Sequence, residues 1–134
     1  MAALKKPKYF KAEESKETLN GNYDPNLPIE TRIYMYTTGA IYNGEWRGGM
    51  RHGKGIMGWP DGAAYEGEWA FNHASGKGKF THMDGDSYIG QWENNKANGK
   101  GVYLNSKGAR YGGDWKDDQQ HGKGTETWQE GASY

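Results

Sequence analysis

Four histidines are the first side chains to consider as metal ligands in this 134-residue sequence, which has no cysteine: His52, His73, His82 and His121. A zinc site needs several ligands that converge on one point. His52 and His121 hold the same place in a repeated unit, three units apart, and a spacing of ~4.8 Å between strands then separates them by ~30 Å. We expect no metal site and interpret the histidines as supports for turns.

Two other patterns suggest ion or phosphate binding. Asp84-Gly85-Asp86 lacks the further oxygen ligands and the late glutamate of a calcium loop, so we interpret it as a turn. Gly-Lys-Gly recurs four times, but inside expected strands rather than between a strand and a helix, which argues against a phosphate cradle. No Ser-His-Asp set or activated nucleophile is present. We therefore expect no enzymatic activity and no cofactor.

The elements that must position any site come from one repeat. The pattern Tyr-x-Gly-x-Trp begins at Tyr42 and returns every 23 residues, and further glycines keep the same register. A fixed period of this length predicts a repeat architecture. The units run over residues 42–64, 65–87, 88–110 and 111–133, with a half unit at 31–41 and the start of a fifth at Tyr134.

Each unit is predicted to be a β-hairpin. Tyr42, Gly44 and Trp46 alternate and so share one face of a strand, whereas several interior glycines argue against a helix. Seven residues after each tyrosine stand residue types that tolerate positive φ, and a one-residue left-handed kink is expected there: Gly49, Asn72, Asn95 and Asp118. Pro60-Asp61-Gly62 predicts the turn into the next hairpin. The expected fold is all-β, an elongated single-layer antiparallel sheet.

The pairing within a hairpin can also be predicted. A turn centred between Gly49 and Met50 sets Trp46 opposite Gly53, Gly44 opposite Gly55, and Tyr42 opposite Met57. Each indole would then cover a glycine, a known way to stabilise bare strand backbone. On this basis Gly55→Val or Gly78→Val is expected to unfold its unit.

The aromatic face is the surface that we expect to bind a partner. A single-layer sheet cannot bury both faces, and tyrosine and tryptophan are favoured at interaction hot spots. The alternative is that these rings pack only on one another and on glycine. The predicted partner-binding residues are Tyr42, Trp46, Tyr65, Trp69, Tyr88, Trp92, Tyr111, Trp115, Trp59 and Phe80.

The opposite face carries one lysine per unit: Lys54, Lys77, Lys100 and Lys123. The predicted pairing sets them against Glu45, Glu68, Gln91 and Asp114 of their own hairpins. We interpret this lysine ladder first as surface electrostatics of the sheet and second as a site for anionic lipid.

Composition sets further limits. The 17 basic and 17 acidic residues cancel, which removes the clustered charge typical of nucleic-acid binding. Zero cysteines suit a reducing compartment, and neither a secretory signal nor a membrane-spanning run is apparent. We expect a cytoplasmic protein. With 34% hydrophobic residues, a repeat array in which each unit contacts its neighbours is favoured over a thick core.

Residues 1–30 precede the array and contain a basic cluster at Lys5, Lys6, Lys8 and Lys11. A short helix is expected within 10–19, and an extended segment after it. The arm is either a loose terminus or a peptide that docks on a partner or covers the first sheet edge. At the other end, Tyr134 opens an incomplete unit, which favours a fragment of a longer chain over continuation of the sheet by another chain.

Tyr-x-Gly-x-Trp followed by His-Gly-Lys-Gly, at 52–55 and 121–124, resembles the MORN repeat (membrane occupation and recognition nexus). Ser75 and Asn98 replace the histidine in the two middle units. The resemblance implies a scaffold in a ciliary, axonemal or other cytoskeletal assembly, such as a radial-spoke head. It also leaves open a membrane module that binds phosphoinositides, or the accessory part of a longer enzyme such as a lipid kinase.

Overall fold

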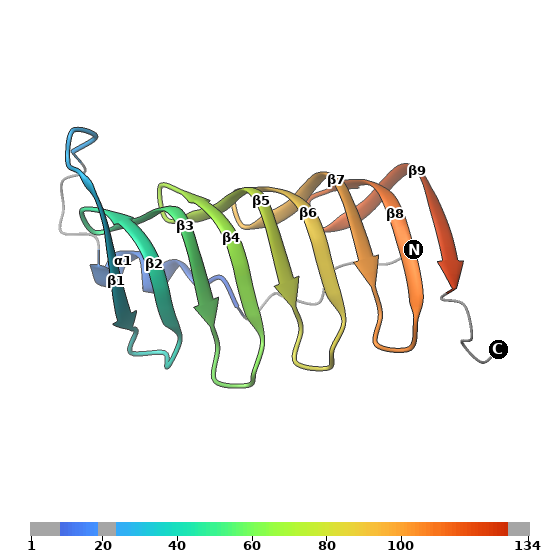
Figure 1. Cartoon of the computed structure of the whole chain (residues 1–134), viewed down its shortest axis with the longest axis horizontal. Coiled ribbons are helices and arrows are strands. Elements are labelled where there is room, and N and C mark those ends of the chain that lie inside the picture. The colour runs from blue at the N-terminus through green and yellow to red at the C-terminus, as the bar shows by residue number, and fades with distance from the viewer. Residues whose placement is uncertain (1–8, 19–23, 129–134) are drawn as a thin grey trace.

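The computed structural model describes residues 9–18 and 24–128. Within them, a single antiparallel sheet of nine strands follows the chain order from β1 to β9 (Figure 1). The strands are β1 (Ile29–Met35), β2 (Ile41–Arg47), β3 (Met50–Gly58), β4 (Ala64–Ala70), β5 (His73–Thr81), β6 (Ser87–Glu93), β7 (Lys96–Leu104), β8 (Ala109–Lys116) and β9 (Gln119–Trp128). The predicted all-β hairpin array is confirmed.

Seven residues in α1 (Ala12–Thr18) form a helix, within the range expected for it. Figure 1 shows α1 behind the sheet. Tyr9 and Phe10, just before α1, pack with the aromatic core. We call residues 9–18 the arm. It docks on the aromatic face of the chain's own repeats and does not lie along the outer edge of β1, although Glu17 at its end contacts Tyr34 of that strand. Docking of the arm on a partner stays a prediction. Lys5, Lys6, Lys8 and the unit predicted to begin at Tyr134 lie outside the described residues.

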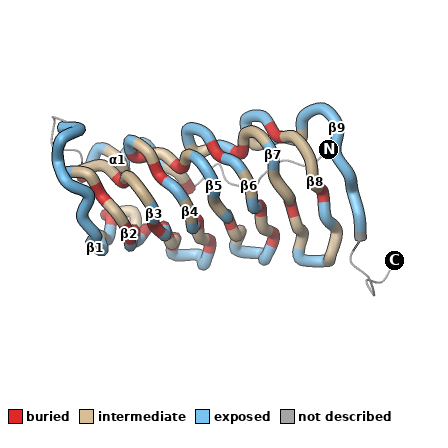
Figure 2. Tube along the Cα trace, turned by 45° about the horizontal axis from the view of Figure 1, so that its top comes forward, coloured by how far each residue is buried: buried red, intermediate tan, exposed pale blue. Residues whose placement is uncertain are grey.

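Aromatic side chains provide most of the core. Figure 2 shows the buried positions as short bands that recur along the strands. All ten residues of the predicted aromatic face are buried, with the tyrosines Tyr42, Tyr65 and Tyr88 at 0% exposure. The edges of these rings meet the faces of their neighbours: Tyr42 lies 5.0 Å from Trp46 and 5.3 Å from Trp69 between ring centroids. The rings therefore form one stack that joins each unit to the next.

Two of the three predicted residue pairs in the hairpin are confirmed. Gly44 pairs with Gly55 and Tyr42 with Met57 as expected, but Trp46 pairs with Arg51 rather than Gly53, because a bulge intervenes. Gly53 has a φ of +105°, which only glycine adopts without strain, and this lets the strand take up extra residues there. The turn is therefore Gly48-Gly49, between Arg47 and Met50.

Glu45 stabilises the bulge between β2 and β3. Its Oε1 accepts a hydrogen bond of 2.7 Å from the backbone N–H of Lys54. The same bond joins Glu68 to Lys77 N, and Gln91 to Lys100 N. The side chains of Glu45, Glu68 and Gln91 thus bond to the backbone of their own hairpins. Each lysine faces the following unit instead: Lys54 opposite Glu68, Lys77 opposite Gln91, and Lys100 opposite Asp114. The predicted lysine partners were wrong by one unit.

Three of the hairpin tips use two left-handed residues rather than one, whereas the first tip has a positive φ at Gly48 and not at the expected Gly49. Phe71 and Asn72 have φ values of 51° and 72°, and the next two tips repeat this pair. Consecutive positive φ angles are typical of the type I′ turns that match the twist of antiparallel strands. In addition, Asn72 Oδ1 accepts a hydrogen bond of 2.9 Å from Arg51 N, so each tip is tied to the one before it.

Candidate functional site

The aromatic groove is the site that this sheet builds most completely. We define it as the aromatic face from β1 to β6 that the arm occupies. Phe10 inserts among four rings from three successive units, with centroid distances of 5.2 Å to Trp59, 5.8 Å to Tyr65, 6.0 Å to Trp69 and 6.1 Å to Trp92. Rings in this range attract one another in addition to burying apolar area.

Tyr9 anchors the start of the arm. Its ring lies 5.0 Å from Trp59, and Trp59 Nε1 donates a hydrogen bond of 3.1 Å to the Tyr9 carbonyl. The Tyr9 hydroxyl donates to Asp61 Oδ2 at 2.5 Å. Burial and this contact raise the pKa of Tyr9 to about 12, and the same bond lowers the pKa of Asp61. Trp59 and Phe80, both predicted as partner-binding residues, thus contact the arm.

A buried cation marks the other end of the groove. Arg51 is 2% exposed, and its guanidinium carbon lies 4.8 Å from the Trp69 ring centroid. Arg51 Nη2 donates to Asn72 O at 2.9 Å and to Ser15 Oγ of the arm at 3.1 Å. Burial lowers the pKa of Arg51, and nearby Tyr36 and Glu14 oppose this shift. Arg51 Nε and Nη1 are buried and find no hydrogen-bond partner among residues 9–18 and 24–128.

Carboxylates on α1 complete the contact. Glu14 is 1% exposed and accepts a hydrogen bond of 2.6 Å from Thr38 Oγ1. Glu17 accepts bonds from the Tyr34 hydroxyl at 2.8 Å and from Thr37 N at 3.1 Å, and the Tyr34 bond is the main reason that the pKa of Glu17 is lowered. The groove therefore holds two adjacent aromatic residues of the arm, followed by carboxylates on a short helix.

Sequence reasoning missed Arg51. The equivalent position in the next two units is Ala74 and Ala97, both 0% exposed, so an arginine interrupts an alanine series. This departure from the repeat is visible in the sequence. Because a buried charge needs a partner of opposite charge, an arginine at this position predicts an acidic group from elsewhere in the chain. It was the available signal for a contact that lies outside the array.

The expectation that the indole rings cover the strand glycines was wrong. The phenol rings of the tyrosines cover them instead. A Cβ atom at Gly78 would lie 2.2 Å from the Tyr65 hydroxyl oxygen, and Gly101 and Gly124 meet Tyr88 and Tyr111 in the same way. Each indole instead donates from Nε1 to a carbonyl one unit earlier: Trp69 to Gly55 O, Trp92 to Gly78 O, and Trp115 to Gly101 O, at 3.0–3.2 Å.

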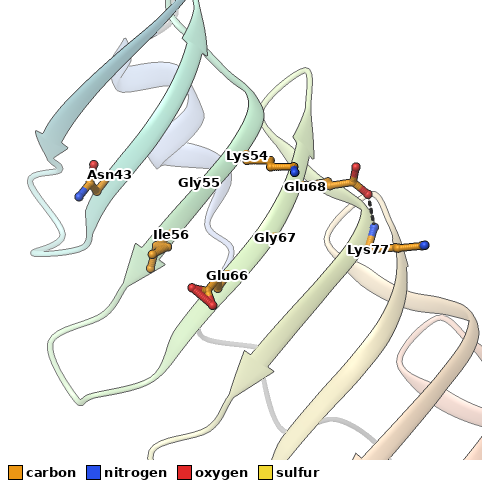
Figure 3. Close-up of a pocket in the computed structure, with 8 residues that line it drawn as sticks. All are labelled: Asn43, Lys54, Gly55, Ile56, Glu66, Gly67, Glu68 and Lys77. Atoms are coloured by element: carbon orange, nitrogen blue, oxygen red, sulfur yellow. Dashed lines mark hydrogen bonds between the residues drawn. The ribbon is translucent and has the colours of Figure 1, made fainter.

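The outer face, opposite the aromatic face, carries the lysine ladder, and two of its lysines, Lys54 and Lys77, line a shallow depression of about 580 Å³ (Figure 3). Lys54, Lys77, Lys100 and Lys123 are all exposed. Glu66 and Glu68 line the same depression, and Lys100 Nζ forms an ion pair with Asp114. The face therefore alternates in charge rather than presenting a continuous basic surface.

His52 and His73 support turns, as predicted. His52 Nδ1 accepts a hydrogen bond of 3.2 Å from Phe71 N at a hairpin tip, and His73 Nδ1 lies 2.9 Å from Asn95 Nδ2. Within Asp84-Gly85-Asp86, Asp84 Oδ1 accepts from Asp86 N at 3.0 Å, which is turn geometry. Across the described residues, no three histidine or acidic side chains gather as a metal site, and α1 is too short and polar to cross a bilayer.

Comparison with known proteins gives the family. The MORN repeat model matches residues 42–64, 65–87, 88–110 and 111–133. No curated protein matches the chain. MORN repeats are generally non-catalytic modules, consistent with a scaffold or with membrane binding. The match covers most of the chain and coincides with the Tyr-x-Gly-x-Trp lattice, so the chain belongs to the MORN-repeat family.

Proposed function

We propose that this chain is a non-enzymatic scaffold whose aromatic groove binds a segment of a partner protein. The observation that supports the proposal is the arm itself: residues 9–18 lie in the groove through ring contacts, hydrogen bonds and a buried charge. A surface that holds one short peptide of the chain has the shape and chemistry to hold another.

The chemistry of the groove defines the partner. Stacked rings select two adjacent aromatic side chains, and the buried Arg51 guanidinium selects a carboxylate four residues further on, where Glu14 now lies relative to Phe10. A segment that lacks this carboxylate would leave Arg51 without a counter-charge, which costs more than the contact gains. The partner segment is therefore an amphipathic turn of helix preceded by two aromatic residues.

The cellular setting follows from the family resemblance alone. We propose a cytoplasmic, cytoskeletal location, in a ciliary or axonemal assembly such as a radial spoke. The partner is then a protein of that assembly, and the arm would have to leave the groove for the partner to bind. Because the arm and the partner compete, the partner's apparent affinity equals its intrinsic affinity multiplied by the fraction of molecules whose groove is open.

A labelled peptide of residues 5–20 tests this, with binding followed by fluorescence anisotropy. Full-length Phe10→Ala loses the central ring contacts, so its groove opens and the peptide should bind about tenfold more tightly than to the native chain. Lys77→Glu, on the outer face, is the matched control and should bind like the native chain. The same peptide with Phe10→Ala should not bind. Equal binding by the native and Phe10→Ala chains would refute the groove as a peptide site.

Membrane binding through the lysine ladder is the second candidate, because all four lysines are exposed on the face that the arm leaves open. The interleaved acids weaken it, since a surface of alternating charge gains little from an anionic bilayer. Flotation with vesicles that contain phosphatidylinositol phosphates decides between the two. Salt-sensitive flotation that is lost when the ladder lysines become glutamate supports a membrane module.

A further inference from the structure

Strand β1 forms an exposed edge of the sheet that lacks the usual protection. Every residue of β1 except Tyr34 is exposed, and the described strands pair with it on one side only, through β2. Edge strands are commonly blunted by lysine, by an internal proline or by a bulge. β1 has no lysine, Pro28 stands just before it, and its pairing with β2 is regular throughout, unlike the bulged pairing between β2 and β3.

The backbone groups on this edge can be assigned. Tyr36 N donates to Ala40 O at 2.8 Å, and the same register pairs Tyr34 with Tyr42. In an antiparallel strand, alternate residues direct both their N–H and C=O groups to the same neighbour. Tyr34, Arg32 and Glu30 therefore bond to β2. The N–H and C=O groups of Ile29, Thr31, Ile33 and Met35 point away from the sheet.

The side chains of β1 are complementary to a second copy of the same strand. If two β1 strands meet antiparallel with Thr31 opposite Thr31, Glu30 lies opposite Arg32 and Ile29 lies opposite Ile33. A twofold axis repeats each of these pairs. Opposite charges, threonine pairs and β-branched pairs are the favourable cross-strand combinations. Centring the axis on Arg32 instead would set two guanidinium groups against each other.

The surroundings of β1 fit this pairing. Ile33 is 68% exposed and Ile29 38%, and both lie on the outer face, away from the arm. Arg32 already donates from Nη2 to Gly48 O at 2.9 Å and lies over the Trp46 ring, which holds its guanidinium in place and leaves other N–H groups free to donate. β1 and β9, at the two ends of the sheet, run in the same direction in Figure 1. If β9 of one copy paired with β1 of the next without reversal, the two strands would be parallel. A twofold axis at β1 instead pairs two β1 strands antiparallel, like the rest of the sheet.

We infer that two copies of this chain associate through β1, antiparallel about Thr31, to form one continuous sheet of both arrays. The contact is isologous, so each copy supplies the same strand and the association closes at two. The inference does not depend on the peptide-binding groove, which is formed by side chains of the aromatic face, such as Tyr34, and not by the outward backbone groups of β1.

Sedimentation equilibrium of the full-length chain is the first test, and a reversible monomer–dimer equilibrium is expected. Thr31→Pro removes an outward N–H and should weaken the dimer at least about tenfold while leaving the bonds to β2 intact. Val102→Thr, on the outer face far from β1, is the control and should not change the equilibrium. A native chain that stays monomeric up to about 1 mM would overturn the inference.

Charge reversal tests the register. Glu30→Arg and Arg32→Glu should each weaken self-association, because each sets like charges together at two places. Mixed in equal amounts, the two variants should form a heterodimer in which both charge pairs are restored. Failure of the folded variants to associate on mixing would contradict the register about Thr31.

Amide hydrogen exchange gives a readout that does not rely on substituting Arg32. Raising the concentration of the native chain should slow exchange at Thr31 and Ile33, whose N–H groups enter the new contact, and leave Arg32 unchanged. Exchange at Thr31 and Ile33 that is independent of concentration would exclude pairing at this edge.

Discussion

Gly55 lies directly beneath the Tyr42 ring, so that a Cβ atom added to Gly55 would stand 2.2 Å from the Tyr42 hydroxyl oxygen and 2.4 Å from its ring carbon Cζ. The Tyr42 hydroxyl donates to Glu45 O at 2.7 Å, which fixes the ring over the glycine. The ring is 0% exposed and wedged between two indoles, so it has no space into which to move.

Gly55→Ala is therefore expected to destabilise the array by about 1–3 kcal/mol, the usual cost of overpacking a core, and Gly55→Val by more. Chemical denaturation measures the change. Gly58→Ala is the matched control on the same strand, because a Cβ at Gly58 would meet nothing within 4 Å. If the two alanine variants unfold at the same denaturant concentration, the ring does not require the glycine.

The repeat lattice was sufficient to predict the sheet, since alternation and turn residues act locally in every unit. It was not sufficient to predict the full register. Strict alternation assumes that each residue of one strand faces one residue of the next. At Gly53 a left-handed φ forms a bulge that adds residues to β3, and the pattern of side chains does not reveal this. The recurrence of glycine at this position in every unit was the sequence signal for the bulge.

Asn95 combines two functions at one hairpin tip. Its φ of 69° is left-handed, and its Oδ1 accepts a hydrogen bond of 2.7 Å from Ala74 N in the preceding unit. Asn95→Gly keeps the backbone and loses the bond, for a cost of about 1 kcal/mol. Asn95→Ala loses the bond and adds backbone strain of about 1–2 kcal/mol. Asn95→Asp retains both features, as Asp118 does in the last unit, and loses only the Nδ2 contact with His73, so it should cost less than either of the other two variants.

Thermal and denaturant unfolding of the three Asn95 variants gives the order. The expected ranking of stability is aspartate, then glycine, then alanine. An alanine variant as stable as the glycine variant would show that the left-handed conformation is not retained.

The arm could not be placed from sequence. A seven-residue helix with three glutamates has little apolar surface of its own, and its docking depends on rings that come together only when β3 to β6 are paired. Its anchor Arg51 lies far from α1 in the sequence. Such a contact follows from three-dimensional complementarity, for which local propensity carries no information.

Arg51 and Glu14 are expected to be energetically coupled. Glu14→Ala leaves the buried guanidinium without its counter-charge, and Arg51→Ala leaves the buried carboxylate in the same state. The double variant removes both charges and introduces the alanine that the next two units carry at the Arg51 position. A double-mutant cycle on unfolding free energies should give a coupling of about 1–3 kcal/mol. Glu13→Ala, at an exposed position on α1, is the control, and additive effects of Arg51 and Glu14 would exclude a direct interaction.

Docking of the arm is expected to weaken in acid. The pKa of Glu17 is lowered chiefly by the Tyr34 hydroxyl, and that of Asp61 chiefly by the Tyr9 hydroxyl. A carboxyl whose pKa is lowered by folding stabilises the folded state above its ordinary pKa, and that contribution disappears as the pH falls through the lowered value. Stability should thus be retained from neutral pH down to about 4 and decline below it.

Denaturant unfolding at stepped pH checks this dependence. Glu17→Gln and Asp61→Asn should each be less stable at neutral pH, with a shallower decline below about pH 4, because fewer protons are taken up on unfolding. Glu13→Gln is the matched carboxyl control, since Glu13 is exposed on the same helix, and it should follow the native curve. A Glu17→Gln curve parallel to the native one would mean that the Tyr34 contact contributes nothing to holding the arm.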